Sequence, residues 1–280
     1  MQKIMIIGAG TMGCGIAQVF ALHGYSVTLR DLTEELLLAA RGRLEKALNR
    51  LAEKGKLTEQ AAQDALARLS YTTDLSAARD AQLVLEAVVE DAELKKDLFA
   101  QLNEICDPAC IFASNTSSVS ITEMAWASGR PDRFIGMHFF NPAPVMELVE
   151  VIRALGTADE TNEAALNLAR DLGKTPVEVQ DSPGFVVNRI LTPMINEAVG
   201  LLAEGVASAA DIDRAMCLGA NHPMGPLALA DLVGCDVVVY ISDVLVKETG
   251  NARYGAHPLL RKMVRAGKLG RKTGEGFYKY

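Results

Sequence analysis

The N-terminal residues carry the pattern that most strongly restricts the fold. A short apolar run, Lys3 to Ile7, leads into GAGTMG, which opens a helical pattern that continues to His23. In the order strand, G-x-G-x-x-G, helix, the first glycine permits a tight turn and the second lets a pyrophosphate approach the backbone. The third lets the helix pack close to the strand, and the helix amides and dipole favour phosphate charge. The residues expected to contact a dinucleotide are Gly8, Ala9, Gly10, Thr11, Met12 and Gly13.

Asp31 extends this prediction to the choice of dinucleotide. It follows a second predicted strand, Ser26 to Arg30, where a carboxylate can accept hydrogen bonds from both ribose hydroxyls of an adenosine. The carboxylate would repel a 2′-phosphate, which carries nearly two negative charges. We therefore expect NAD rather than NADP. Arg30 leaves the question partly open, because a guanidinium beside the ribose could offset some of that repulsion.

The composition is that of an ordinary globular protein. Of its 280 residues, 49% are hydrophobic and 22% are charged, enough for one large or two ordinary domains. The net charge of -7 argues against a nucleic-acid surface, which needs a basic excess. The N-terminus enters a strand at once, which leaves no room for a signal peptide, and no apolar stretch of about 18 residues predicts a membrane span.

The cysteines predict a reduced protein. They are odd in number and include no C-x-x-C pair, and the C-x3-C of Cys106 and Cys110 has no neighbouring ligands for a zinc site. We expect a cytoplasmic chain without a metal.

Two further predicted strands end in polar residues. Leu83 to Val88 is followed by Glu90 and by a helix from Asp91 to Ile105 that contains Lys95 in its first turns. A residue just past the carboxyl end of a strand lies on the rim at which open parallel sheets bind ligands. A favourable charge at the N-terminus of the following helix explains Glu90 equally well. Ile111 to Ala113 leads into Ser114-Asn115-Thr116-Ser117-Ser118, more small polar residues than one helix cap requires. Ser117 is favoured as a binding residue and not a nucleophile, since G-x-S-x-G is absent.

The segment IGMHFFNPAPVMELVE holds a histidine and carboxylates in otherwise apolar sequence. A strand from Phe134 is predicted to end at His138, a turn follows, and a second strand from Val145 to Ile152 contains Glu150. A lone histidine in an apolar run is more often a hydrogen-bonded core residue. The alternative is a catalytic histidine at a strand end that faces a cleft.

The character of the chain changes near Pro183. Before it, alternating strands and helices predict an α/β, Rossmann-type, mostly parallel sheet over residues 1–183. Within this part, long helices are expected from Thr33 to Lys54 and from Thr58 to Leu69, and a cap at Thr157 with Glu160. Residues 184–280 predict an all-helical second domain, beginning with a helix from Phe185 to Gly205, with an ordered, aromatic-anchored loop near the C-terminus.

Seven segments, taken together, resemble the 3-hydroxyacyl-CoA dehydrogenase family. They are GAGTMG, SNTSS, GMHFFNP, LVEVI, DSPGFVVNRI, NHPMGPLALAD and GRKTGEGFY, in this order over essentially the whole chain. The length is most similar to that of the bacterial 3-hydroxybutyryl-CoA dehydrogenases. The resemblance implies an NAD-dependent enzyme that acts on acyl-CoA thioesters and forms a homodimer through its helical domain. Charge and hydropathy, as above, lead us to expect no nucleic-acid or membrane partner.

The resemblance also implies roles for individual residues. His138 would transfer the proton with Glu150 as its partner, Ser117 would bind the substrate oxygen, and Asn188 would orient the acyl group. Lys54 would contact the coenzyme A portion, although its position beside Lys56 at a predicted turn also suits a solvated surface lysine. Residues expected around NAD, besides the glycine turn and Asp31, are Glu90, Lys95, Asn115, Asn141 and Lys272.

Two alternatives stay open. A crystallin-like dinucleotide-binding protein without activity would share the scaffold, but it would have no physical reason to keep His138, Glu150, Ser117 and Asn188 together. A dehydrogenase of free 3-hydroxyacids would also begin G-x-G-x-M-G, but it would be expected to carry a lysine base where this chain has Asn188.

Overall fold

A computed structural model describes residues 1–280, and the chain divides into two compact units, Met1–Ser182 and Pro183–Tyr280. Each unit is described by itself.

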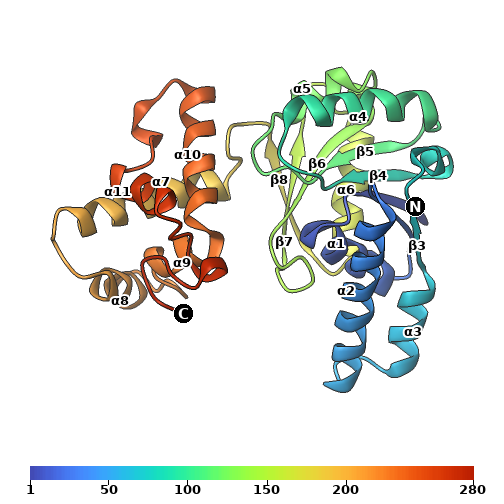
Figure 1. Cartoon of the computed structure of the whole chain (residues 1–280). Coiled ribbons are helices and arrows are strands. Elements are labelled where there is room, and N and C mark those ends of the chain that lie inside the picture. The colour runs from blue at the N-terminus through green and yellow to red at the C-terminus, as the bar shows by residue number, and fades with distance from the viewer. The chain divides into compact units, whose positions relative to one another are not determined.

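The first unit is built on one eight-stranded sheet (Figure 1). Its strands are β1 (Lys3–Ile7), β2 (Ser26–Arg30), β3 (Leu69–Thr72), β4 (Leu83–Glu86), β5 (Ile111–Ser114), β6 (Phe134–Phe139), β7 (Leu148–Arg153) and β8 (Thr175–Gln180). The spatial order is β3-β2-β1-β4-β5-β6-β7-β8. All neighbouring pairs are parallel except β6 and β7. The predicted Rossmann-type, mostly parallel sheet is therefore confirmed, and the strand order reverses direction between β1 and β4.

Helices cover both faces of this sheet. They are α1 (Thr11–Leu22), α2 (Glu34–Glu53), α3 (Glu59–Ala67), α4 (Ala92–Ile105), α5 (Ile121–Ala127) and α6 (Asp159–Asp171), with the 3-10 turns η1 (Leu75–Asp80) and η2 (Pro131–Arg133). Ile4 and Ile6 of β1 face a core shared with α1, α2 and α6. On the other face, Phe99 of α4 packs edge-on against Phe134 of β6. Because both faces are covered there, the central strands β1, β4, β5 and β6 are buried almost throughout, whereas the outer strands β2, β3 and β8 are only partly buried.

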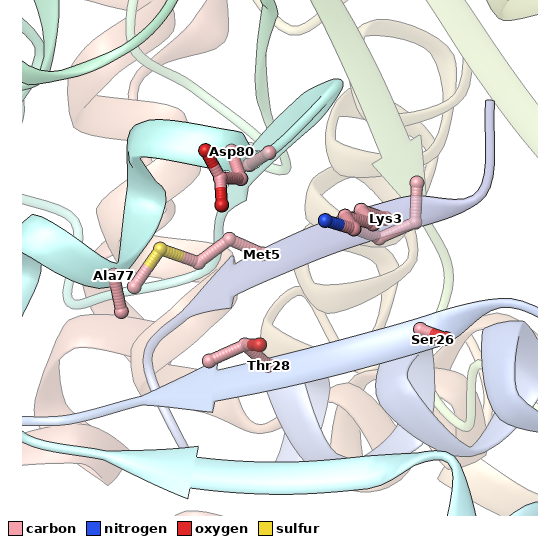
Figure 2. A pocket seen from close by; sticks show the side chains of 8 residues that line it. Lys3, Met5, Ser26, Thr28, Ala77 and Asp80 are labelled. Atoms are coloured by element: carbon pink, nitrogen blue, oxygen red, sulfur yellow. The ribbon is translucent and has the colours of Figure 1, made fainter.

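One stretch of the sheet face is open, as Figure 2 shows. Lys3, Met5, Ser26 and Thr28 line a depression of about 270 Å³ together with η1. Lys3 and Ser26 begin their strands, whereas the glycine turn follows the opposite end of β1. The depression therefore lies away from the edge at which a parallel sheet binds its ligands.

The second unit is helical, as predicted. It contains α7 (Val187–Ala203), α8 (Ala209–Gly219), α9 (Pro226–Val233), α10 (Cys235–Thr249) and α11 (Pro258–Arg265), with the 3-10 turns η3 (Ala252–Tyr254) and η4 (Arg271–Thr273). The C-terminal segment is tied down by the buried carboxylate of Asp231, which accepts hydrogen bonds from the backbone amides of Phe277 and Tyr278 at 2.9 Å. Both aromatic rings pack on the core of this unit, so the glycine-rich tail is ordered.

Three local predictions were wrong. The strand predicted from Val145 begins at Leu148, because the amides of Val145 and Met146 close a turn onto the Pro142 carbonyl. Leu69 was assigned to a helix, but α3 ends at Ala67 and Leu69 begins β3, a strand that was not predicted. Thr157 does not cap α6, whose N-cap is Ala158. Its hydroxyl instead donates to the Phe134 carbonyl at 2.7 Å, because the strand end offers an acceptor in a buried position.

No helix in the structure is long and apolar enough to cross a membrane.

Candidate active site

The glycine turn lies where β1 meets β4. Gly8 has a φ of 104°, and a side chain there would meet the Ala87 carbonyl oxygen at 2.4 Å. A Cβ on Gly13 would lie 1.7 Å from the Gly8 carbonyl oxygen. Only glycine satisfies both positions, because the first needs a left-handed backbone and the third needs helix and strand in direct contact. The turn thus leaves the N-terminus of α1 accessible to a phosphate.

Asp31 holds this turn in place. Its carboxylate accepts hydrogen bonds from the backbone amides of Ala9 and Leu32, both at 2.7 Å. Arg43 of α2, which no sequence motif indicated, donates to the Ala9 carbonyl oxygen at 2.6 Å. Arg30 turns away toward β3, where its Nε donates to the Thr73 carbonyl. Arg43 is therefore the guanidinium that contacts the glycine turn.

His138 and Glu150 form a buried pair. The antiparallel register of β6 and β7 sets the two residues directly opposite each other. His138 Nδ1 lies 2.8 Å from Glu150 Oε2, and the residues are 7% and 1% exposed. The Phe140 ring lies 4.4 Å from the imidazole, measured between centroids. Because a carboxylate accepts hydrogen bonds, Nδ1 carries the proton in the neutral ring and Nε2 carries the lone pair.

Glu90 and Ser117 meet at the neighbouring strand ends. Glu90 Oε1 accepts hydrogen bonds from the Ser117 amide at 2.8 Å and from its hydroxyl at 3.1 Å. Glu90 Oε2 lies 3.1 Å from the Lys95 ammonium. Burial raises the pKa of Glu90, but Lys95 and the hydrogen bonds from Ser117 and Thr116 lower it, and the pKa lies below its usual value. Glu90 is therefore an ionised acceptor that holds Ser117 in position.

The two asparagines lie near the end of β6, the strand that carries His138. Asn115 Oδ1 accepts a hydrogen bond from the Phe139 amide at 2.9 Å, which braces β6 beside His138. Asn141 begins the turn between β6 and β7, and its peptide bond to Pro142 is cis. Lys174 donates to the carbonyls of Ala143 and Met146, so this turn is held against the end of α6.

The other three predicted residues lie at the end of helix α2, on helix α7 and in the turn η4. Lys54 is the C-cap of α2. Asn188, in the first turn of α7, and Lys272, whose Nζ lies 2.7 Å from Asp236, belong to the second unit. Their roles remain predictions.

Comparison with known proteins identifies the class. Residues 3–182 match the family described as "3-hydroxyacyl-CoA dehydrogenase, NAD binding domain", and residues 184–280 match "3-hydroxyacyl-CoA dehydrogenase, C-terminal domain". The chain belongs to the 3-hydroxyacyl-CoA dehydrogenase family, and its first unit is the NAD-binding domain of that family.

Several similar proteins align with this chain over its full length. A 3-hydroxybutyryl-CoA dehydrogenase of Clostridioides difficile is 53% identical, with 100% of this chain and 99% of that protein covered. The solved structure of (S)-3-hydroxybutyryl-CoA dehydrogenase from Ralstonia eutropha has 48% sequence identity and a TM-score of 0.96, covering 100% of this chain and 99% of that one. The Mycobacterium tuberculosis FadB2 structure has a TM-score of 0.97 at 45% identity, with coverage of 100% and 99%.

The position of Asp31 predicts a preference for NADH over NADPH. A 2′-phosphate beside this carboxylate meets like-charge repulsion, so NADH should bind roughly tenfold or more tightly, a difference of about 1.4 kcal/mol or more. Fluorescence titration of the protein with each reduced dinucleotide measures the ratio. Asp31→Asn should narrow it, because the negative charge is removed. Equal affinities in the unaltered protein would contradict the assignment.

Proposed function

We propose that this protein interconverts (S)-3-hydroxyacyl-CoA and 3-ketoacyl-CoA with NAD(H), and that 3-hydroxybutyryl-CoA and acetoacetyl-CoA are its substrate pair. The observation that carries the proposal is the buried His138–Glu150 pair at 2.8 Å, at the end of a strand in the NAD-binding domain. The names of the full-length relatives support the choice of substrate.

His138 acts as the general acid and base. Oxidation of a secondary alcohol requires loss of the hydroxyl proton as hydride leaves the same carbon, and an alkoxide formed without a base would be too costly. NAD supplies the hydride acceptor when it is bound. His138 Nε2 takes the proton and returns it in the reverse direction. Glu150 holds the tautomer through Nδ1 and stabilises the imidazolium.

The other residues position the reactants. Ser117 binds the substrate oxygen. Its backbone amide stays hydrogen-bonded to Glu90, and its one hydroxyl proton, which is donated to Glu90 in this structure, turns to the substrate oxygen and favours the charge that develops on it. Asn188 orients the acyl group and Lys54 contacts the coenzyme A portion. Contacts to the dinucleotide come from the glycine turn, Asp31, Glu90, Lys95, Asn115, Asn141 and Lys272.

A substrate series tests the reaction. We expect NADH consumption with acetoacetyl-CoA, and the acyl-chain preference follows from comparing longer 3-ketoacyl-CoA thioesters. Free acetoacetate is the matched control, because it lacks only the thioester. Turnover of the free acid in preference to its thioester would favour a hydroxyacid dehydrogenase. Dinucleotide binding without any turnover would favour a binding protein.

Substitution of the buried pair tests the mechanism. Since a positioned general base contributes roughly 10²- to 10⁴-fold, His138→Ala and Glu150→Gln should each lower kcat by about that range. NADH affinity should change little. His23→Ala is the control, because His23 is an exposed residue that caps α1 through the Val19 carbonyl. Near-normal turnover in either test variant would remove that residue from the mechanism.

We further propose that the protein is a homodimer assembled through its helical unit. Several large apolar side chains are exposed there, among them Ile190 of α7, Leu218 of α8 and Val233 of α9, and exposed apolar surface of this kind is typical of interfaces. Light scattering at micromolar concentration should give about twice the chain mass of 30.0 kDa. A single-chain mass at that concentration would contradict the proposal.

A further inference from the structure

A fully buried carboxylate lies behind the site. Glu86, the last residue of β4, is 0% exposed. Its Oε1 accepts hydrogen bonds from the Val88 amide and the Lys95 ammonium, both at 2.7 Å. Its Oε2 accepts one from the Ser114 hydroxyl at 2.6 Å. A buried charge persists only when it is paired and hydrogen-bonded, and Glu86 meets both conditions.

The first route from Glu86 to the site runs through Lys95. This lysine is 1% exposed and lies between two carboxylates, Glu86 at 2.7 Å and Glu90 at 3.1 Å. The Glu90 side chain is 29% exposed, so it occupies the outer end of the chain of contacts. Glu90 in turn accepts both the amide and the hydroxyl of Ser117. Glu86 therefore holds the Lys95 ammonium in place. Lys95 in turn holds Glu90, the carboxylate that accepts both hydrogen bonds from Ser117.

The second route runs through β5. The Ser114 hydroxyl donates to Glu86 and accepts a hydrogen bond from the Thr116 amide at 3.2 Å. The Thr116 hydroxyl donates to Glu90 at 2.8 Å and accepts one from the Val119 amide at 2.9 Å. The two routes converge on Glu90, and they enclose the loop that carries Ser117.

Stability alone is a poor explanation for this arrangement. A buried ion pair often contributes no more to stability than apolar side chains of similar volume would, because desolvation offsets the attraction. A fully satisfied polar network does, however, restrict its members to one arrangement. In this network Lys95 lies between two carboxylates and lowers the pKa of Glu90, so Glu90 keeps the charge with which it holds Ser117.

From these contacts we infer that Glu86 is a positioning residue for Ser117, acting through Lys95 and Glu90 and through Ser114 and Thr116. The inference rests on the proposed function for its kinetic consequence, because Ser117 binds the substrate oxygen in that proposal. Its structural consequence, a rigid Ser117 loop, is independent of any activity.

Glu86→Gln is the test variant, since it keeps the shape and removes the charge that fixes Lys95. Misplacement of a contact to the reacting group costs up to about 100-fold, and kcat/KM for acetoacetyl-CoA should fall roughly 10- to 100-fold. Hydrogen exchange of a peptide covering residues 114–119 should become faster. Glu93→Gln is the control, because the Glu93 side chain is 80% exposed and pairs with Lys96 on the same helix. It should behave like the unaltered protein in both measurements.

A double-mutant cycle shows whether Glu86 acts through Ser117. In a Ser117→Ala background, and with NADH saturating so that the dinucleotide contacts of Glu90 and Lys95 do not enter, Glu86→Gln should lower kcat/KM for acetoacetyl-CoA by less than about twofold, because residues that act through one another are not additive. The full single-variant loss in that background, or unchanged exchange of residues 114–119, would overturn the inference. If Glu86→Gln does not fold, Ser114→Ala, which removes one donor from the same carboxylate, takes its place in both measurements.

The exchange measurement separates the two proposals. A protein without thioester turnover would refute the proposed function, and the exchange of residues 114–119 would then decide the positioning role alone. Faster exchange in Glu86→Gln with Glu93→Gln unchanged supports that role, and equal exchange in all three proteins overturns it.

Discussion

The antiparallel pairing of β6 with β7 is the constraint on which the candidate site depends. Directly opposite residues on such strands project to the same face with Cβ atoms roughly 5 Å apart, and His138 stands opposite Glu150 in this register. A slip of one residue would send the Glu150 side chain to the other face of the sheet. Gly136, on the same face as His138, has no room for a side chain beside Ile121 and Ile152, so packing of α5 reinforces the register.

Parallel strand pairing positions the remaining residues of the site, as the antiparallel pairing of β6 and β7 positions His138. Strands β1, β4, β5 and β6 are neighbours and run in one direction, so the residues after each of them collect along one edge. Backbone hydrogen bonds link these ends. The Ala87 amide donates to the backbone carbonyl of Ile7, and the Asn115 amide donates to the backbone carbonyl of Glu86. The glycine turn, Glu90 and Ser117 are thereby brought to the edge at which β6 presents His138.

The sequence predicted the parts of this arrangement that depend on local pattern. The glycine turn, Asp31 and most strand positions follow from glycine geometry and apolar runs, and the helices after Pro183 follow from periodicity. β3 was missed because LSYT is short and only half-buried, and the helix signal before it extended too far. The capping pattern of Thr157 was misread because its true acceptor, the Phe134 carbonyl, is distant in sequence.

The part that could not be predicted is the connection between strands. Glu86 is the only charged residue in LVLE, and Lys95 is a buried lysine in a helix that begins at Ala92. The charge in an apolar run was a usable signal, but its partners Ser114 and Lys95 become apparent only once β4 is known to pair with β5. Side-chain networks that cross neighbouring strands need the strand order first.

Energetic grounds argue against an ordinary core role for His138. A core histidine needs partners for its donor and acceptor nitrogens, and backbone carbonyls, amides or hydroxyls would provide them at little cost. This chain instead buries a carboxylate, Glu150, to 1% exposure beside it, and burial of that charge costs several kcal/mol before any interaction with the ring. Apolar residues at both positions would pack β6 on β7 with no such cost. A carboxylate that stabilises the imidazolium form is useful where the ring must gain and lose a proton, and this pair lies at the end of a strand in an NAD-binding domain.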